Sequence, residues 1–269
     1  MFILICPVSG GSFPSQLSII QHLCEIQFIP DVTLASSGGN VAAYIASAAH
    51  WKWPAIERIS RELNNDLFIA PWNSISGLSI AIGYFQGNLY NRGEGVINFI
   101  KRHFTSESIV EHEIWTGTYN KDRQQARLFC NRASDKTILD MKTIDHELTH
   151  SMKPVFAAGD IELIAKASVA SASIPAIVPA QVIDGEAHID GGVAGASPLT
   201  IMQEPILAYS RKNGSSLHLI YVNSIDLSKT DIKPGKNVLD TLKQTTSDLV
   251  RSQTVNDRLA AYQLLRCHP

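Results

Sequence analysis

The sequence predicts an α/β fold of three layers, in which helices cover both faces of a central, mostly parallel sheet. Continuous apolar runs at Phe2–Val8 and Leu217–Val222 are typical of strands that are buried on both faces. Between these runs, strand patterns alternate with helix patterns, and two early strands are followed at once by Ser/Gly turns. In an open parallel sheet, such turns meet at the crevice beyond the carboxyl ends of the strands.

The first unit is a strand, a glycine-containing loop and a helix. The strand Phe2–Val8 leads into Ser9-Gly10-Gly11-Ser12, where the glycines allow backbone N–H groups to gather around one point. Residues Gln16–Cys24 then have the apolar spacing of an amphipathic helix.

The second unit carries a serine at a sharp turn. A short apolar run at residues 31–35 stops at Ser36-Ser37-Gly38-Gly39, and the alanine-rich segment Val41–Ala49 follows as a helix. A hydroxyl at such a corner lies next to the free N–H groups of the helix, as in a nucleophile elbow. Ser37 is therefore a candidate nucleophile. The alternative is a Ser/Gly turn that only joins a strand to a helix.

The rest of the chain continues the α/β pattern without a repeat or a clear domain boundary, so we predict one domain over residues 1–269. Ile114–Tyr119 and Ala126–Cys130 are expected to pair as strands. Further helices are expected at Pro54–Asn64, Gly95–Phe104, Ile161–Ala170 and most of Val238–Leu265.

The segment Phe68–Asn91 differs from its surroundings. It is rich in Gly, Ser, Ile and aromatic residues and has almost no charge. One interpretation is an irregular part of the core. The other is a cap, at about residues 68–91, that lines an apolar pocket or touches a lipid surface.

Composition narrows the class of protein. The 269 residues are 45% hydrophobic and carry a net charge of −2, so nothing predicts nucleic-acid binding, which usually needs a basic face. The four cysteines form no CxxC pair, which favours a reducing compartment. No stretch has the ~18 uninterrupted apolar residues of a membrane span. We expect a cytoplasmic protein.

A serine nucleophile needs a base, and the sequence offers few candidates. His218 lies inside an apolar strand and His268 is at the end of the chain, so neither occupies the late loop of a usual triad histidine. Asp190 is better placed, because it ends a short strand and is followed by two glycines. An ordinary Asp-Gly turn is the alternative interpretation.

A rival motif lies at His146-Glu147-Leu148-Thr149-His150, which has the HExxH pattern of zinc peptidases. On a helix the two histidines would share one face, and Glu147 could act as a general base. The Lys153-Pro154 pair would end any helix within a turn, and no third ligand has the right spacing. We therefore expect solvated loop residues and no metal.

Four stretches in register resemble the patatin-like phospholipase family. Ser9–Ser12 resembles its glycine-rich oxyanion loop, and Ala35–Gly39 resembles its Gly-x-Ser-x-Gly elbow. Ala170–Pro179 resembles its Ala-Ser-x-x-x-Pro segment, and Ile189–Val193 resembles its Asp-Gly-Gly block. The resemblance runs from about residue 2 to about residue 222.

The resemblance implies a lipid acyl hydrolase with a Ser-Asp dyad and no cofactor. Ser37 would form an acyl-enzyme, Asp190 would be the base, and N–H groups of Gly10, Gly11 and Gly38 would hold the oxyanion. It also implies a lipid or acyl-ester substrate and transient contact with a membrane surface; the sequence leaves the oligomeric state open.

The chain departs from the family at the oxyanion loop and the elbow. The loop has two glycines instead of three, Phe13 and Pro14 stand where a basic residue and a glycine are common, and Ala35 replaces the first glycine of the elbow. The missing basic residue affects phosphate recognition more than ester cleavage, so a glycerolipid or a simple acyl ester is expected as readily as a phospholipid. A catalytically silent lipid-binding protein is the alternative.

Overall fold

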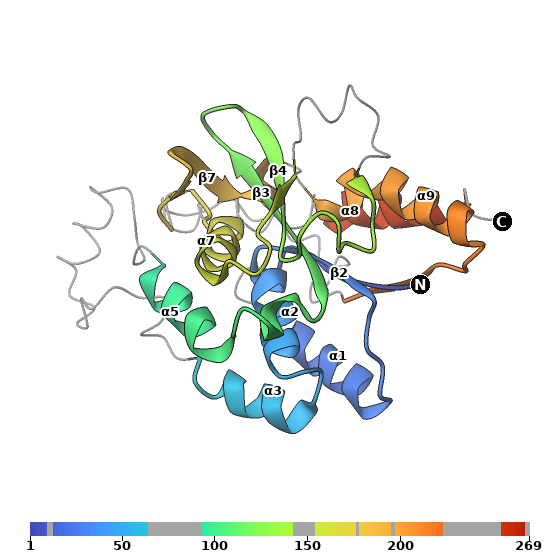
Figure 1. The fold of residues 1–269 in the computed structure, drawn as a ribbon, viewed down its shortest axis with the longest axis horizontal. Coiled ribbons are helices and arrows are strands. Elements are labelled where there is room, and N and C mark those ends of the chain that lie inside the picture. Colours follow the sequence, from blue (N-terminus) through green and yellow to red (C-terminus); the bar gives the residue numbers. More distant parts are fainter. Residues whose placement is uncertain are drawn as a thin grey trace, which may run out of the picture.

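A computed structural model of the chain describes residues 1–9, 13–63, 93–141, 154–175, 178–194, 197–222 and 254–266. These residues form one sheet of eight strands, six of them in the order β5-β4-β3-β2-β1-β8, while β7 joins at β3 and β6 pairs with β7 (Figure 1). The strands are β1 Phe2–Cys6, β2 Val32–Ser36, β3 Glu113–Asn120, β4 Gln125–Cys130, β5 Val155–Phe156, β6 Gln181–Ile183, β7 Glu186–Asp190 and β8 His218–Tyr221.

The half of the sheet that contains β8, β1, β2 and β3 is parallel throughout. Among the described strands, antiparallel pairing is confined to β3–β4, β3–β7 and β6–β7. The carboxyl ends of β1 and β2 therefore lie side by side, as the sequence predicts.

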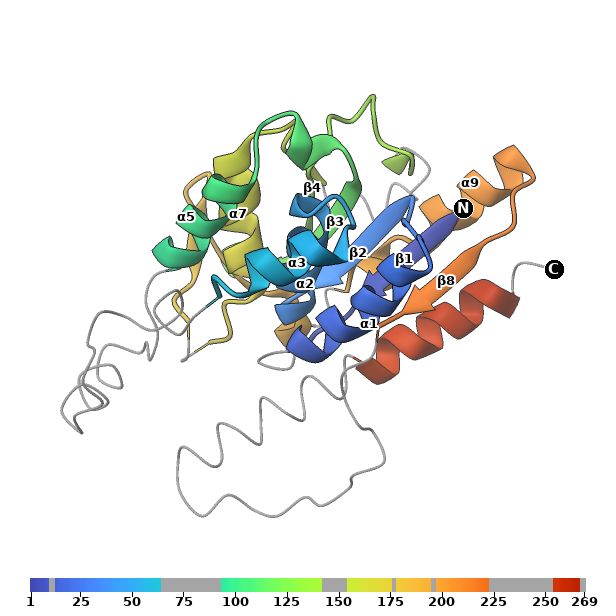
Figure 2. The same ribbon diagram turned by 90° about the horizontal axis from the view of Figure 1, so that it is seen from below.

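Helices cover both faces of the sheet. One face is packed by α1 Phe13–Glu25, α2 Gly38–Ala48, α3 Trp53–Ser60, α5 Glu94–His103 and α7 Ile161–Ser171. The other is packed by α8 Pro198–Ile201, α9 Gln203–Asn213 and a helix over residues 254–266, which lies beside β8 (Figure 2). The three-layer α/β/α prediction is confirmed.

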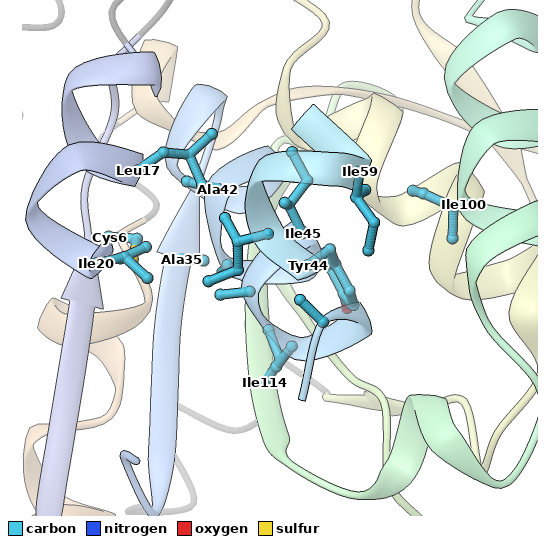
Figure 3. Close-up of a cluster of buried hydrophobic side chains, with 14 of the residues drawn as sticks. Cys6, Leu17, Ile20, Ala35, Ala42, Tyr44, Ile45, Ile59, Ile100 and Ile114 are labelled. Atoms are coloured by element: carbon cyan, nitrogen blue, oxygen red, sulfur yellow. The ribbon is translucent and has the colours of Figure 1, made fainter. Parts of the chain in front are cut away.

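The larger core lies between the sheet and α2. Along β1, Leu4 and Cys6 face this core while Ile3 and Ile5 face the other, because successive side chains of a strand point to opposite faces. Figure 3 shows Tyr44 and Ile45 of α2 packed among side chains from neighbouring helices and strands. This packing fixes α2, and with it the turn that precedes the helix.

The expected elements mostly lie where the sequence predicts them, with boundaries shifted by a few residues. The expected strand Phe2–Val8 ends early at Cys6, and α1 begins at Phe13, before the predicted Gln16. The short strands β5 and β6 and the helix α9 were not expected from the sequence. Of the long C-terminal helix that was predicted, the structure describes residues 254–266.

Each described helix is too short or too polar to cross a membrane.

Candidate active site

The carboxyl ends of β2 and β7 meet on the same edge of β3. Strand β2 runs parallel to β3 and ends with Ser36 opposite Gly117. Strand β7 runs antiparallel to β3 and ends with Asp190 opposite Thr118, the next residue along. Because the two strands approach head-on, the residue after Ser36 comes close to Asp190. The sheet therefore brings together Ser37 and Asp190, which are far apart in sequence.

Ser37 occupies the sharp turn that the sequence predicts between β2 and α2. Its backbone has φ 52° and ψ −131°, a conformation that is rare for residues other than glycine and costs about 1–3 kcal/mol. The neighbouring Gly39 lets the helix approach β1 closely, since a Cβ there would lie 2.3 Å from the carbonyl oxygen of Cys6. This strained, tightly packed turn has the geometry of a nucleophile elbow.

The Ser37 hydroxyl lies beside the Asp190 carboxyl group, close enough to favour its ionised form. Both residues are only 1% exposed. Burial raises the pKa of Asp190 to about 7, although the nearby Ser37 hydroxyl and the hydrogen bond from the amide of Gly192 favour the ionised form. A carboxyl group with this pKa is a much stronger base than an ordinary aspartate, and it titrates near neutral pH.

The turn after β7 holds the Asp190 carboxyl group in place. The Gly192 amide donates to Asp190 Oδ1 at 2.8 Å, and the Asp190 amide donates to the Ser173 carbonyl oxygen at 3.0 Å. Gly192 also leaves room for β1, because a Cβ there would lie 2.6 Å from Val8 Cγ2. The carboxyl group thus has one fixed orientation beside the chain that leaves β1.

A second serine, Ser171 at the end of α7, fixes the backbone of the elbow. Its Oγ accepts a hydrogen bond from the Ser37 amide at 2.9 Å and donates to the Gly117 carbonyl oxygen at 2.7 Å. Ser171 is fully buried. The bridge therefore connects the turn to β3 and uses the Ser37 amide, so that this amide is not available to a substrate.

A buried polar network anchors the first turn of α2. Thr116 Oγ1 donates to Asn40 Oδ1 at 3.0 Å, and Asn40 Nδ2 donates to Ser168 Oγ at 3.1 Å. These side chains come from β3, α2 and α7, so the network connects the three elements that surround the elbow. Nothing in the sequence pattern distinguishes Asn40 or Ser168 from other polar residues, so sequence reasoning did not find them.

His188, the buried histidine near Asp190, interacts through both ring nitrogens with residues other than Ser37 and Asp190. His188 Nδ1 lies 3.2 Å from Thr118 Oγ1, and Nε2 lies 3.5 Å from Asn120 Nδ2. Burial and the nearby Arg127 lower the pKa of His188. The other strand histidine, His218, pairs with Phe2 at the start of β1, at the opposite end of that strand from the elbow. Within the described residues, neither histidine is hydrogen-bonded to Ser37.

The remaining predicted residues divide into two groups. Gly38 is the first residue of α2, directly after Ser37, where helix N–H groups point outward without intrahelical partners. Gly10, Gly11, the proposed cap at about residues 68–91, and His146, Glu147 and His150 lie outside the described residues. Within the described part of the chain, no cluster of three or more His, Cys, Asp or Glu side chains could hold a metal ion.

An apolar cavity lies between α2 and α5, with Val41, Tyr44 and Phe99 among its lining residues. Its volume of about 20 Å³ is close to the space that one water molecule needs. The cavity therefore does not accommodate an acyl chain as it stands.

A family model described as patatin-like phospholipase matches residues 9–202, a range that includes the elbow serine Ser37 and Asp190 at the end of β7. No curated protein matches the chain.

Proposed function

Because the chain belongs to the patatin-like phospholipase family, which indicates a lipid acyl hydrolase, we propose that it cleaves a lipid ester with Ser37 as nucleophile and Asp190 as base. The observation that carries the proposal is the buried juxtaposition of the Ser37 hydroxyl and the Asp190 carboxyl group where β2 and β7 meet on β3. Direct contact between nucleophile and base is the first geometric requirement of this chemistry.

The first half-reaction forms an acyl-enzyme. Ser37 Oγ attacks the ester carbonyl carbon while its proton passes to the Asp190 carboxylate. The carbonyl oxygen becomes an oxyanion in the tetrahedral intermediate. When the intermediate collapses, the C–O bond to the alcohol breaks and the alcohol oxygen takes the proton from Asp190. The lipid alcohol leaves, and the acyl group stays on Ser37.

The second half-reaction uses the same two groups with water as nucleophile. Asp190 accepts a proton from the water, whose oxygen attacks the acyl carbon. Collapse of the second tetrahedral intermediate releases the carboxylic acid, and the proton returns from Asp190 to Ser37 Oγ. The pKa of about 7 suits both directions, because a catalytic group works best with a pKa near the operating pH.

The oxyanion requires hydrogen-bond donors that are already in position. We assign the Gly38 amide, at the positive end of α2, to this role, together with the Gly10 and Gly11 amides predicted from the sequence. The Ser37 amide is excluded because Ser171 holds it. Each such donor typically contributes about 2.7–4 kcal/mol to stabilisation of the transition state.

The substrate class follows from the family and is narrowed by the chain's own residues. A glycerolipid or a simple acyl ester suits the chain as well as a phospholipid does, because Phe13 and Pro14 replace a basic residue and a glycine that are common in the family's loop. Phe13 is the first residue of α1. A cytoplasmic location and transient contact with membranes stay predictions from the sequence.

A serine-directed fluorophosphonate ester tests the proposal. We expect one molecule to attach to Ser37, and Ser37→Ala to abolish both labelling and hydrolysis of medium-chain p-nitrophenyl esters. Ser36→Ala is the matched control, because Ser36 is equally buried but ends β2 one residue before the turn. Attachment at Ser36, or turnover that persists in Ser37→Ala, would show that the assignment is wrong. A folded protein that binds lipid but never labels would favour the silent alternative.

A further inference from the structure

Ser9 carries a buried hydroxyl whose role is not explained by the proposed mechanism. The residue directly follows the Pro7-Val8 pair after β1. The residue is 4% exposed, and among the described residues its Oγ has no hydrogen-bond partner. Burial of an unpaired hydroxyl costs free energy, so such a group needs an explanation, and a catalytic role is one of the known explanations. The dyad mechanism described above does not use this hydroxyl.

The chain next to Ser9 packs against the two turns that carry Ser37 and Asp190. In the register of the parallel β1–β2 pair, Cys6 lies opposite Ala35, so the chain after β1 continues beside the elbow. A Cβ at Gly39 would lie 2.4 Å from the Pro7 carbonyl oxygen. On the other side, Val8 packs against Gly192, in the turn that holds Asp190. Ser9 is the next residue of this segment.

The segment is also held rigidly. The buried side chain of Gln16 donates from Nε2 to the carbonyl oxygens of Pro7 at 3.0 Å and Val222 at 3.2 Å. A group that stabilises developing charge is effective when the protein fixes it before reaction, because it then needs no reorganisation. Gln16 supplies this fixation for the start of the loop.

Two amides at the site are already committed. The Ser37 amide donates to Ser171, and the Gly192 amide donates to Asp190. The loop also contains two glycines between two serines. A donor from a side chain at the start of this loop would supplement the backbone donors at the position where the oxyanion develops.

We propose that Ser9 is a further catalytic residue, whose Oγ–H donates a hydrogen bond to the substrate carbonyl oxygen as that oxygen becomes negative. The inference rests on the proposed function of Ser37 and Asp190. No bond to Ser9 forms or breaks, and its proton stays on Oγ. The Gly38 amide, on the neighbouring α2, donates to the same oxygen.

The test compares Ser9→Ala with Ser47→Ala. Ser47 is a matched control, because it is 1% exposed and its hydroxyl also has no partner within the described structure, but it lies near the far end of α2. Removal of an unpaired hydroxyl is neutral or stabilising. We therefore expect both variants to unfold thermally at or above the wild-type temperature. Only Ser9→Ala should lose kcat, by roughly 10²–10³-fold, with KM within a few-fold.

A trifluoromethyl ketone with an apolar tail gives a second readout. It forms a tetrahedral adduct with a reactive serine, and the adduct carries the same oxyanion. Its affinity should fall in Ser9→Ala in parallel with kcat and stay unchanged in Ser47→Ala. Ser9→Cys, which keeps the volume but donates only weakly, should fall between wild type and Ser9→Ala.

Three outcomes decide the matter. If Ser9→Ala keeps kcat within about threefold of wild type, the inference is wrong while labelling of Ser37 still supports the proposed function. If activity falls only together with the unfolding temperature, Ser9 is structural and the inference is wrong. If the wild-type protein fails to label at Ser37, the proposed function itself is wrong, and the inference that rests on it falls too.

Discussion

The backbone amide of Ser37 donates to Ser171 Oγ at 2.9 Å, and this single contact connects the elbow to the far end of α7. The same oxygen donates to the Gly117 carbonyl oxygen at 2.7 Å. Ser171 therefore does two things. It satisfies a buried amide in a strained turn, and it directs that amide away from the position where a substrate would bind.

Replacement of Ser171 by alanine should loosen the elbow. Ser171→Ala leaves the Ser37 amide and the Gly117 carbonyl unpaired in the core, at a cost of about 1–3 kcal/mol for each group. We expect a lower midpoint in urea unfolding and a clear loss of kcat. Ser173→Ala is the control, since Ser173 is also fully buried and donates to the Val169 carbonyl oxygen, but does not bond the elbow. An equal loss of kcat in both variants would contradict this role.

The pH dependence of the rate should follow Asp190. Because the ionised carboxylate is the base and burial raises its pKa to about 7, kcat/KM should rise with pH up to about 7 and then level off. A histidine base would give a similar curve. The two differ on heating, because imidazolium ionisation takes up heat and carboxyl ionisation takes up almost none. The apparent pKa should therefore hardly move between 15 and 35 °C, and a steady downward shift on warming would indicate a histidine.

The stability of the fold should also depend on pH through Asp190, but it should fall as pH rises, whereas the rate should increase. The folded-state pKa of about 7 is above the ordinary value of 3.8. At pH values between these two, the folded protein therefore holds a proton on Asp190 that the unfolded chain has released. The contribution of Asp190 to the free energy of unfolding therefore falls as pH rises from about 4 to about 7. Asp190→Asn removes this term. We expect the variant to gain stability relative to wild type at pH 8 and much less at pH 4, as measured by urea unfolding at both values.

The elements that position Ser37 and Asp190 can be predicted from the sequence, because each depends on a short local pattern of residues. A β-rich run that stops at small residues predicts the elbow, and Asp190 before two glycines predicts a strand end beside a turn, although the structure buries this carboxyl group. The head-on meeting of β2 and β7 on β3 depends on the pairing of Ser36 with Gly117 and of Asp190 with Thr118. This strand pairing joins residues that are far apart in the sequence, so no local sequence pattern predicts it.

The sequence was insufficient for the supporting contacts. Ser171 was visible only as part of a motif, and its bridge to Ser37 depends on how α7 packs against the sheet. Asn40 and Ser168 look like ordinary helix residues until their mutual hydrogen bond is seen. The strand β6 could not be predicted because its three residues are too few to show the apolar–polar alternation of a strand. The segment is a strand because it pairs with β7.

Gly39 should tolerate no side chain. A Cβ there would lie 2.3 and 2.4 Å from two backbone oxygens, of Cys6 and Pro7, which cannot move without displacing β1. Gly39→Ala should cost about 1–3 kcal/mol or more and should reduce ester hydrolysis, since the first turn of α2 would shift. Gly185→Ala is the control. Its φ of +79° carries some strain, but nothing lies within 4 Å of the new Cβ, so turnover should stay normal. Normal turnover in Gly39→Ala would mean that the elbow does not need this close approach.

The sharpest prediction contrasts Asp190 with the histidines. Asp190→Asn keeps the shape of the side chain but cannot accept the Ser37 proton, so we expect kcat to fall by at least ~10²–10⁴-fold. His188→Ala removes hydrogen bonds to Thr118 and Asn120, which costs stability, but leaves the contact between Ser37 and Asp190 intact. His218→Ala acts at the opposite end of β1 and should change the rate only slightly. The measurement is kcat on a p-nitrophenyl ester at pH 8, with the folded fraction of each variant checked by circular dichroism. A dead His188→Ala or His218→Ala beside an active Asp190→Asn would establish a histidine base and exclude the Ser-Asp dyad, because a carboxamide has no proton-accepting group at this pH.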